Sequence, residues 1–209
     1  MPDLFQGASE APIDLNGVKV YLGWLNRSQQ ESMILDLRQV AASAPFRRYE
    51  TPGGRQMSVC MTAAGRVGWM TDRSGYRYSE HYEGNCSWPS IPASVMDVWR
   101  KVADTDRNAD SCLINYYSED AKMGLHQDKD EADFSWPVVS ISLGDEALFR
   151  VGGQSRKDPT RSHWLRSGDV ALLAGDTRLA YHGIDRIKFG SSDLLPDGGR
   201  INLTIRMAR

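Results

Sequence analysis

The chain has little of what a disulfide framework or a membrane anchor requires. Its three cysteines, Cys60, Cys86 and Cys112, are odd in number and widely spaced, and no C-x-x-C pair occurs. The sequence therefore favours neither paired disulfides nor a cysteine-bound zinc site. No apolar run approaches the roughly 20 residues of a membrane-spanning helix. The opening MPDLFQGASEAP lacks the basic-then-apolar pattern of a signal peptide. We therefore expect a cytoplasmic protein that makes no membrane contact.

The remaining composition is that of an ordinary globular protein. Of the 209 residues, 41% are hydrophobic and 25% are charged, and the net charge is −2. This length is sufficient to bury a sizeable core, so we expect a single domain over residues 1–209. Nothing in the sequence indicates an obligate dimer, and a monomer is expected. The slightly negative net charge, taken alone, argues against a nucleic-acid partner.

The distribution of charge changes that expectation. Between Phe46 and Tyr78 the only acidic residues are Glu50 and Asp72. The same stretch interleaves arginines with aromatic residues: Arg47, Arg48, Tyr49, Arg55, Arg66, Trp69, Arg73, Tyr76, Arg77 and Tyr78. A second basic cluster consists of Arg156, Lys157 and Arg161. Because cations bind phosphates and rings stack on bases, the pattern fits a single-stranded nucleic acid about as well as it fits a solvated surface with aromatic core anchors.

The first half of the chain predicts both helix and strand. After an expected poorly ordered arm over residues 1–17, strands are predicted at 17–25 and 55–65. Residues 26–45 and 93–104 predict amphipathic helices, because apolar residues recur in them at helical spacing. Residues 68–92 are rich in glycine, serine, aromatic and charged residues and are expected to form a binding loop.

After residue 110 the pattern changes to short strands separated by turns. Strands are predicted at 112–117, 137–144, 146–153, 168–175, 179–184 and 200–208. Such spacing is typical of a β-sandwich or jelly roll and not of alternating βαβ units. We therefore expect an α+β, mainly β fold. A double-stranded β-helix (jelly-roll) core would occupy residues 111–209, and residues 1–110 would form an extension that supplies recognition.

Histidine is also scarce, and this narrows the search for a metal site. The four histidines are His81, His126, His163 and His182. His126 and Asp128 are one residue apart, so on extended backbone the imidazole and carboxylate lie on the same side. One more histidine would complete the two-His, one-carboxylate face that holds non-haem Fe(II). His182 fits best, since it lies between a predicted strand and a glycine turn, whereas His81 is in a polar loop and His163 stands among charged residues. We assign His126, Asp128 and His182 as metal ligands and catalytic centre.

The last predicted strand has one polar and one apolar face. Ile201, Leu203, Ile205 and Met207 alternate with Arg200, Asn202, Thr204 and Arg206. A solvated polar face would explain this pattern, but arginines that face the interior of a sandwich need anions. Asn115 and Tyr117 also share a face, and together these groups suit a small dicarboxylate. Because Arg200 and Arg206 lie about 20 Å apart on extended backbone, their side chains must lean toward each other to reach one ligand.

Taken together, these motifs resemble those of the AlkB family of Fe(II)- and 2-oxoglutarate-dependent dioxygenases, in particular the bacterial subgroup that repairs alkylated bases. The resembling motifs are N-x-Y at 115–117, HQDKDE at 126–131, RLAYHGI at 178–184 and R-x-N-L-T-x-R at 200–206, with TPGG, MSV and GWMTDRSGYRYS upstream. The similarity covers roughly residues 50–206, which includes the expected nucleotide-recognition lid. H-x-D alone is common, but the ordered set of motifs is specific.

The resemblance implies Fe(II), 2-oxoglutarate and O2 as cofactors and cosubstrates. His126, Asp128 and His182 would hold the iron. Arg206 would pair with the carboxylate end of 2-oxoglutarate that chelates the metal, and Arg200 with the distal carboxylate. The pocket would be completed by Asn115, Tyr116, Tyr117 and Asn202.

The resemblance also implies a DNA substrate, either single-stranded or with one base flipped out of a duplex. Trp69 would stack on the flipped base, with His126 on the other face, and Asp130 would accept from the exocyclic amine. From the residues alone, Trp69 fits a core position and Asp130 an acidic turn slightly better. Bases methylated at N1 of adenine or N3 of cytosine are cationic, which favours an indole and an anionic neighbour. The nucleic-acid backbone would be held by Tyr76, Arg77, Tyr78 and Arg156.

The implied reaction is direct-reversal DNA repair, in which hydroxylation of the N-methyl group of 1-methyladenine or 3-methylcytosine leads to loss of formaldehyde, with succinate and CO2 as co-products. Two alternatives stay open: the same chemistry on RNA, protein or lipid, and a non-catalytic jelly-roll protein that binds a metal or dicarboxylate. The resemblance implies a tryptophan at the position where this chain has Leu173. That position lies on the oxygen side of the site, so oxygen access or turnover is expected to differ.

Overall fold

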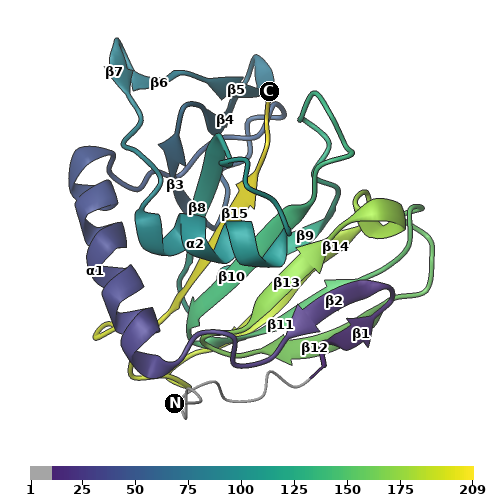
Figure 1. Ribbon diagram of the computed structural model, residues 1–209. Coiled ribbons are helices and arrows are strands. Elements are labelled where there is room, and N and C mark those ends of the chain that lie inside the picture. The colour runs from purple at the N-terminus through teal and green to yellow at the C-terminus, as the bar shows by residue number, and fades with distance from the viewer. Residues whose placement is uncertain (1–10) are drawn as a thin grey trace.

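The computed structural model describes residues 11–209, and in them two antiparallel sheets pack face to face (Figure 1). The larger sheet has seven strands in the order β1-β2-β13-β10-β15-β8-β3, and the smaller has four in the order β12-β11-β14-β9. In the larger sheet the bounds are β1 (Ile13–Leu15), β2 (Val18–Tyr21), β13 (Val170–Leu173), β10 (Val138–Gly144), β15 (Arg200–Arg206), β8 (Ser111–Tyr117) and β3 (Cys60–Gly65). In the smaller they are β12 (Arg161–Leu165), β11 (Glu146–Val151), β14 (His182–Lys188) and β9 (Met123–His126).

The jelly-roll prediction is confirmed. Strands β13, β10, β15 and β8 lie opposite the smaller sheet, and together these two layers form the double-stranded β-helix. The first half of the chain adds β1 and β2 to one edge of the larger sheet and β3 to the other. Residue 110 is therefore not a boundary between separately packed units.

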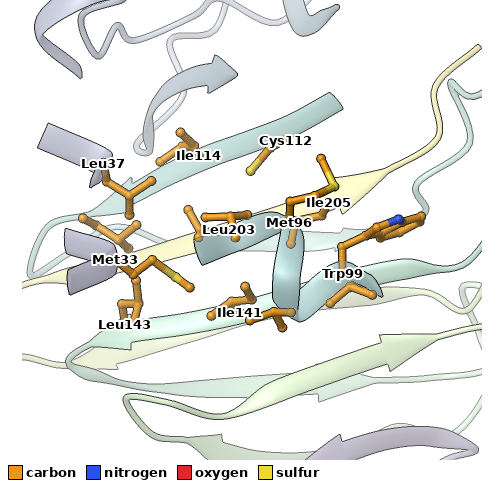
Figure 2. Close-up of a cluster of buried hydrophobic side chains, with 14 of the residues drawn as sticks. Met33, Leu37, Met96, Trp99, Cys112, Ile114, Ile141, Leu143, Leu203 and Ile205 are labelled. Atoms are coloured by element: carbon orange, nitrogen blue, oxygen red, sulfur yellow. The ribbon is translucent and has the colours of Figure 1, made fainter. Parts of the chain in front are cut away.

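Two helices cover the outer face of the larger sheet (Figure 1). Helix α1 (Arg27–Ser43) begins at Asn26, whose side chain accepts from the Gln29 backbone N–H at 3.0 Å, while the Gln29 side chain accepts from the Asn26 N–H at 2.9 Å. Helix α2 (Ala93–Val102) presents an apolar stripe to the same face. Figure 2 shows the resulting core, which includes Met33, Leu37, Met96, Trp99, Ile141, Leu203 and Ile205. Each fully buried Leu or Ile stabilises the fold by about 1.5–3 kcal/mol.

Alternation along β15 divides its residues between two environments. Leu203 and Ile205 are completely buried beneath the helices. Arg200 and Arg206 lie on the opposite face, in the space between the two sheets. The polar face of this strand is therefore interior and not solvated, as the dicarboxylate hypothesis requires.

Residues 68–92 differ from the expected binding loop, because they form two hairpins. Strands β4 (Gly68–Asp72) and β5 (Gly75–Ser79) make the first, and β6 (His81–Glu83) and β7 (Cys86–Ser87) make the second. The turn of the first hairpin is closed by Asp72, which accepts from the Ser74 backbone N–H at 2.8 Å, and by Gly75 at φ 124°. Small exposed ribbons of this kind bury little apolar surface, so their sequence resembles that of a loop.

Other elements were also missed by the sequence patterns. The short strands β9 and β12 were not predicted, and β12 (RSHWL) is polar because it lies at an edge of the smaller sheet. Strand β1 falls within the arm expected over residues 1–17, of which residues 1–10 lie outside the described part. A 3-10 turn spans Gly175–Thr177. Within the described residues, no helix is long and apolar enough to cross a membrane.

Candidate active site

The three predicted metal ligands come together beside the paired strands β9 and β14 of the smaller sheet. His126 is the last residue of β9 and His182 the first of β14, and the two are directly paired across these strands. Asp128 follows two residues after His126. Asp128 Oδ1 lies 3.8 Å from His126 Nε2, and Asp128 Oδ2 lies 3.8 Å from His182 Nε2. Because one ligand atom from each residue lies within 4.8 Å of the others, the triad converges on one point.

The protonation of these ligands suits a divalent metal. Nδ1 of His126 lies 2.9 Å from the Gly124 carbonyl, and Nδ1 of His182 lies 2.9 Å from the Ala180 carbonyl. A carbonyl only accepts, so each Nδ1 carries the proton and each Nε2 lone pair is free for a metal. Burial, followed by the neighbouring His126, lowers the pKa of His182 to about 4, so this ring is neutral at pH 7.

Asp128 is ionised despite its burial. Burial alone raises the pKa of this carboxyl, but Arg206 and the two histidines outweigh that effect and hold the pKa well below its usual value. Asp128 Oδ2 has no hydrogen-bond partner among the described residues. Two imidazoles and one carboxylate form the donor set that non-haem Fe(II) prefers.

A cavity between the sheets begins at these ligands and extends along β15. Besides the triad, its lining contains apolar residues and a polar group made up of Asn115, Tyr117, Ser140, Arg200, Asn202, Thr204 and Arg206. The two arginines, predicted to be far apart along the strand, therefore face one space. Buried arginines on a single cavity are the arrangement that a dicarboxylate would neutralise.

Arg200 shows that this cavity fits an anion. Its side chain is buried, donates from Nη2 to Ser142 Oγ at 2.9 Å and lies 5.3 Å from the Tyr117 ring centre. Within the described residues Nε and Nη1 have no partner and no carboxylate forms an ion pair with it. Burial lowers the pKa of Arg200, and Tyr117 opposes this effect only in part. A ligand carboxylate would supply both the missing charge and the missing acceptors.

Arg206, at the metal end, is already partly neutralised. Its Nη1 donates to Glu131 at 2.6 Å, and its Nη2 lies 3.3 Å from Asp128 Oδ2. Burial lowers the pKa of Arg206, but Asp128, Tyr78 and Glu131 outweigh it and raise the pKa above the usual value. Nε has no partner among the described residues.

Three neutral groups complete the cavity, and one expected residue does not. Asn202 donates to Ser140 Oγ at 2.8 Å, and Asn115 donates to Asn202 Oδ1 at 3.4 Å. Burial raises the pKa of Tyr117 to about 12, so its hydroxyl stays a donor. The expectation that Tyr116 lines this pocket was wrong, because alternation along β8 turns its ring to the other face. There it packs against Phe46 and donates to the Gly198 carbonyl at 3.3 Å.

A wider groove opens beside the triad. It shares five residues with the cavity: Leu113, Met123, His126, Asp128 and Arg206. Four residues predicted to bind substrate line it: Trp69, Tyr76, Asp130 and Arg156. Trp69 stacks on Tyr76, with ring centres 5.6 Å apart and an interplanar angle of 21°, and its Nε1 donates to Asp130 Oδ2 at 2.8 Å. The two depressions thus meet at the metal ligands.

The other two predicted substrate residues do not line the groove. Arg77 forms an ion pair with Asp72 at 2.6 Å in its own hairpin. Tyr78 points inward and donates to Glu131 at 2.7 Å, so its hydroxyl is not presented to a phosphate. Local pairing also engages other arginines of this stretch, since Arg47 contacts Glu83 and Arg73 contacts Glu50.

The sequence patterns did not predict a buried ionic cluster that contacts the loop between β9 and β10, which carries Asp128. Glu131 contacts Arg206 and Arg178, and Arg178 also donates to the Asp128 carbonyl at 2.7 Å. Glu131 follows Asp130 in the run DKDEAD, where an acidic side chain usually indicates a solvated turn. Arg178 begins the motif RLAYHGI, but the motif by itself implied no role for it.

Leu173 lines the cavity together with His182 and Phe149.

Comparison with known proteins agrees with this geometry. The model of the 2OG-Fe(II) oxygenase superfamily matches residues 17–206. The chain is 53% identical over 194 residues to the alpha-ketoglutarate-dependent dioxygenase AlkB homolog of Caulobacter vibrioides, covering 92% of this chain and 88% of that protein. It is 43% identical over 213 residues to the alpha-ketoglutarate-dependent dioxygenase AlkB of Escherichia coli, covering 100% and 98%. A solved structure of OsALKBH1 matches with a TM-score of 0.75 at 30% identity, over 91% of this chain and 97% of that one.

These matches span both sheets and the hairpins, so they concern the whole described fold and not the ligand motif alone. They also exclude the alternative of a binding protein without turnover, because the relatives are dioxygenases that use the same cosubstrate. Fe(II), 2-oxoglutarate and O2 are accordingly the cofactor and cosubstrates of this enzyme. The chain is a 2-oxoglutarate-dependent dioxygenase and belongs to the AlkB group of the 2OG-Fe(II) oxygenase superfamily.

Proposed function

We propose that this enzyme repairs DNA by oxidative demethylation of N-alkylated bases of the 1-methyladenine and 3-methylcytosine type. The products are the restored base, formaldehyde, succinate and CO2. One observation carries the proposal. The groove that contains Trp69, Tyr76 and Asp130 also contains the metal ligands His126 and Asp128, so a flat group lying on the indole would share one groove with them.

The groove suits a cationic base. Trp69 offers an aromatic face, and its Nε1 hydrogen bond orients Asp130 by engaging Oδ2. The second carboxylate oxygen of Asp130 is then available for the exocyclic amine. A ring methylated at N1 of adenine or N3 of cytosine carries positive charge, which both the indole face and the carboxylate attract. An unmethylated base lacks this charge, so these contacts favour the damaged base.

The chemistry of the reaction belongs to the bound iron and 2-oxoglutarate, which activate O2 for hydroxylation of the methyl group. His126, Asp128 and His182 would hold the iron, Arg206 the chelating carboxylate end of 2-oxoglutarate and Arg200 its distal carboxylate. Asn115, Tyr117 and Asn202 would orient the cosubstrate as neutral donors and acceptors. The hydroxymethyl group then breaks down to formaldehyde without further help from the protein.

Arg156 would hold the nucleic-acid backbone. It is exposed at the rim of the groove and lies 6.0 Å from the centre of the Tyr181 ring. A cation over an aromatic ring at the mouth of a base pocket suits a phosphate next to an extruded nucleotide. A single strand, or a duplex with one flipped base, satisfies this arrangement. We also propose that the protein acts in the cytoplasm as a monomer, as one catalytic domain in which residues 1–110 supply recognition.

The test is formaldehyde release from a single-stranded DNA oligonucleotide that carries one 1-methyladenine. Wild-type enzyme should release formaldehyde and succinate in equal amounts, and only when Fe(II), 2-oxoglutarate and O2 are all present. His126→Ala should abolish release, whereas the exposed-site control Glu119→Gln should not change it. Succinate without formaldehyde from DNA would remove this substrate from the proposal. Release from the matching RNA oligonucleotide alone would replace DNA with RNA.

A further inference from the structure

The hairpin of β4 and β5, here called the nucleotide hairpin, contacts the metal loop, which is the connection between β9 and β10. It does so at two consecutive residues of that loop, Asp130 and Glu131. Trp69 and Tyr78 are directly paired across strands β4 and β5, so their side chains lie on the same face of the hairpin. Trp69 donates to Asp130 at 2.8 Å, and Tyr78 donates to Glu131 at 2.7 Å. Asp130 and Glu131 lie in the same loop as the metal ligand Asp128, two and three residues after it. The hairpin and the metal site are therefore joined by an exposed contact and a buried one.

The buried contact centres on Glu131, whose side chain is 0% exposed. Oε1 accepts from Tyr78 and, at 2.6 Å, from Arg206, while Oε2 accepts from Arg178 at 3.1 Å. Burial alone raises the pKa of Glu131, but Arg206 and the Tyr78 hydroxyl outweigh it, so the pKa is lowered and the carboxylate is ionised. Burial raises the pKa of Tyr78 strongly, which keeps its hydroxyl protonated as a donor.

This carboxylate constrains both the metal loop and the cosubstrate arginine. Arg178, held by Glu131, donates to the Asp128 carbonyl at 2.7 Å and to the Trp136 carbonyl at 2.8 Å, which fixes the loop on both sides. Arg206 is held through Nη1, and its planar guanidinium leaves little rotational freedom once one nitrogen is fixed. The remaining nitrogens then face Asp128 and the cavity.

We propose that Glu131 is a positioning residue that aims Arg206 at 2-oxoglutarate, and that the Tyr78 hydroxyl ties the position of the nucleotide hairpin to it. Binding of 2-oxoglutarate and binding of the methylated strand then strengthen each other. The second half rests on the proposed function, since it requires a nucleic acid on Trp69. The physical reason is shared ordering. A base stacked on Trp69 fixes the hairpin and with it the Tyr78–Glu131 contact, so less freedom is lost when Arg206 engages its ligand, and the reverse holds equally.

Glu131 could instead compete with 2-oxoglutarate for Arg206. The two roles predict opposite changes in 2-oxoglutarate affinity when the charge of Glu131 is removed. Glu131 is negative and pairs with the arginine that a ligand carboxylate must also reach. If competition dominated, removal of its charge would tighten 2-oxoglutarate binding. If positioning dominates, removal weakens it, because Arg206 loses a defined orientation. The direction of the change therefore separates the two roles.

The first experiment needs no nucleic acid. The affinity of the Fe(II)-loaded protein for 2-oxoglutarate is measured by calorimetry without O2, for wild type, Glu131→Gln and the exposed control Glu119→Gln. Loss of one buried charge-assisted hydrogen bond should weaken binding about tenfold or more in Glu131→Gln. The control should match wild type. Unchanged or tighter binding in Glu131→Gln would overturn the positioning role.

The second experiment measures the linkage, with Tyr78→Phe as the variant. This change removes only the hydroxyl and keeps the ring, so the linkage stays testable even if Glu131→Gln does not fold. In wild type, a saturating oligonucleotide carrying 1-methyladenine should strengthen 2-oxoglutarate binding by about fivefold or more. In Tyr78→Phe this ratio should fall toward one. The control Tyr82→Phe, on the neighbouring hairpin, should keep the wild-type ratio.

The outcomes of the two experiments are independent. Equal ratios in wild type and Tyr78→Phe would overturn the linkage. A wild-type protein that does not bind the oligonucleotide would overturn both the linkage and the proposed substrate, while the result for Glu131→Gln would still decide how Arg206 is positioned.

Discussion

The cosubstrate cavity and the base groove share five residues but are built in different ways. The polar residues of the cavity stand mainly on the regular strands β8, β10 and β15, where alternation decides which side chains face inward. The groove also contains residues of β3, β8, β9 and β15, but its four predicted substrate residues stand on the β4–β5 hairpin, the loop after β9 and the loop after β11. Exposure differs accordingly: Arg200 is 1% exposed, whereas Tyr76 is 51% exposed.

This difference sets how strongly each region constrains its ligand. A buried cation such as Arg200 destabilises the protein until an anion pairs with it, so the cavity selects for an anionic ligand and few substitutions in it should be tolerated. The exposed charges of the groove, on Lys129, Asp130 and Arg156, are screened by water and salt. We therefore expect substitutions in the cavity to have large effects on a single ligand. Substitutions in the groove should have smaller, graded effects.

The largest expected effect is that of Arg200→Met. Affinity for 2-oxoglutarate should fall about a hundredfold, because the distal carboxylate loses its charge-assisted hydrogen bonds. Thermal unfolding without 2-oxoglutarate should be unchanged or shifted upward, since the variant removes a buried cation that lacks a carboxylate partner among the described residues. Calorimetry and a thermal melt give the two readings, with the exposed Arg66→Met as control. An affinity close to that of wild type would show that the distal carboxylate binds elsewhere.

An intermediate effect is expected for Trp69→Ala. Loss of one base-stacking contact should weaken binding of the methylated oligonucleotide by about tenfold to a hundredfold. Decarboxylation of 2-oxoglutarate in the absence of DNA should stay near the wild-type rate, because Trp69 lines the groove and not the cavity. Trp164→Ala is the matched control, since that ring lies beside Arg186 on the smaller sheet. Equal oligonucleotide affinity in wild type and Trp69→Ala would exclude the indole as the stacking surface.

The smallest effects on oligonucleotide binding are expected for two arginine variants, Arg156→Ala and Arg77→Ala. Arg156→Ala should weaken oligonucleotide binding several-fold and reduce the slope of affinity against salt by about one, as expected for one lost phosphate contact. Arg77→Ala should change the slope less, because Arg77 is already paired with Asp72. Fluorescence anisotropy over a range of salt concentrations measures both. A larger change of slope in Arg77→Ala would mean that the Asp72 pair opens when DNA binds.

Periodicity predicted the parts of the molecule that regular strands control. The shared face of Arg200 and Arg206, and that of Asn115 and Tyr117, follow from alternation with period two. The same rule places Tyr116 on the opposite face, and its inclusion in the pocket ignored that rule. The H-x-D spacing at the end of a strand likewise anticipated the convergence of the metal ligands.

The hairpins and the buried ionic cluster could not be predicted in this way. Residues 68–92 have a loop-like composition because two-stranded ribbons on a surface bury little apolar area. Glu131 stands in an acidic run that is typical of a solvated turn, yet it is fully buried. Its burial is possible only because Arg178 and Arg206, distant in sequence, supply matching charge.

The sequence by itself determined the jelly-roll class, from the spacing of short strands and turns. It also determined the His126–Asp128 pair and the polar face of β15, because each depends on local spacing along one strand or loop. His182 lies on another strand and was assigned by comparing the four histidines. The tertiary structure alone decided which residues share the groove, that Arg77 is paired and that Tyr78 turns inward to Glu131. The physical reason is that a buried charge or hydroxyl must find its partner from another part of the chain. Only the packing of the hairpin against the metal loop brings those partners together.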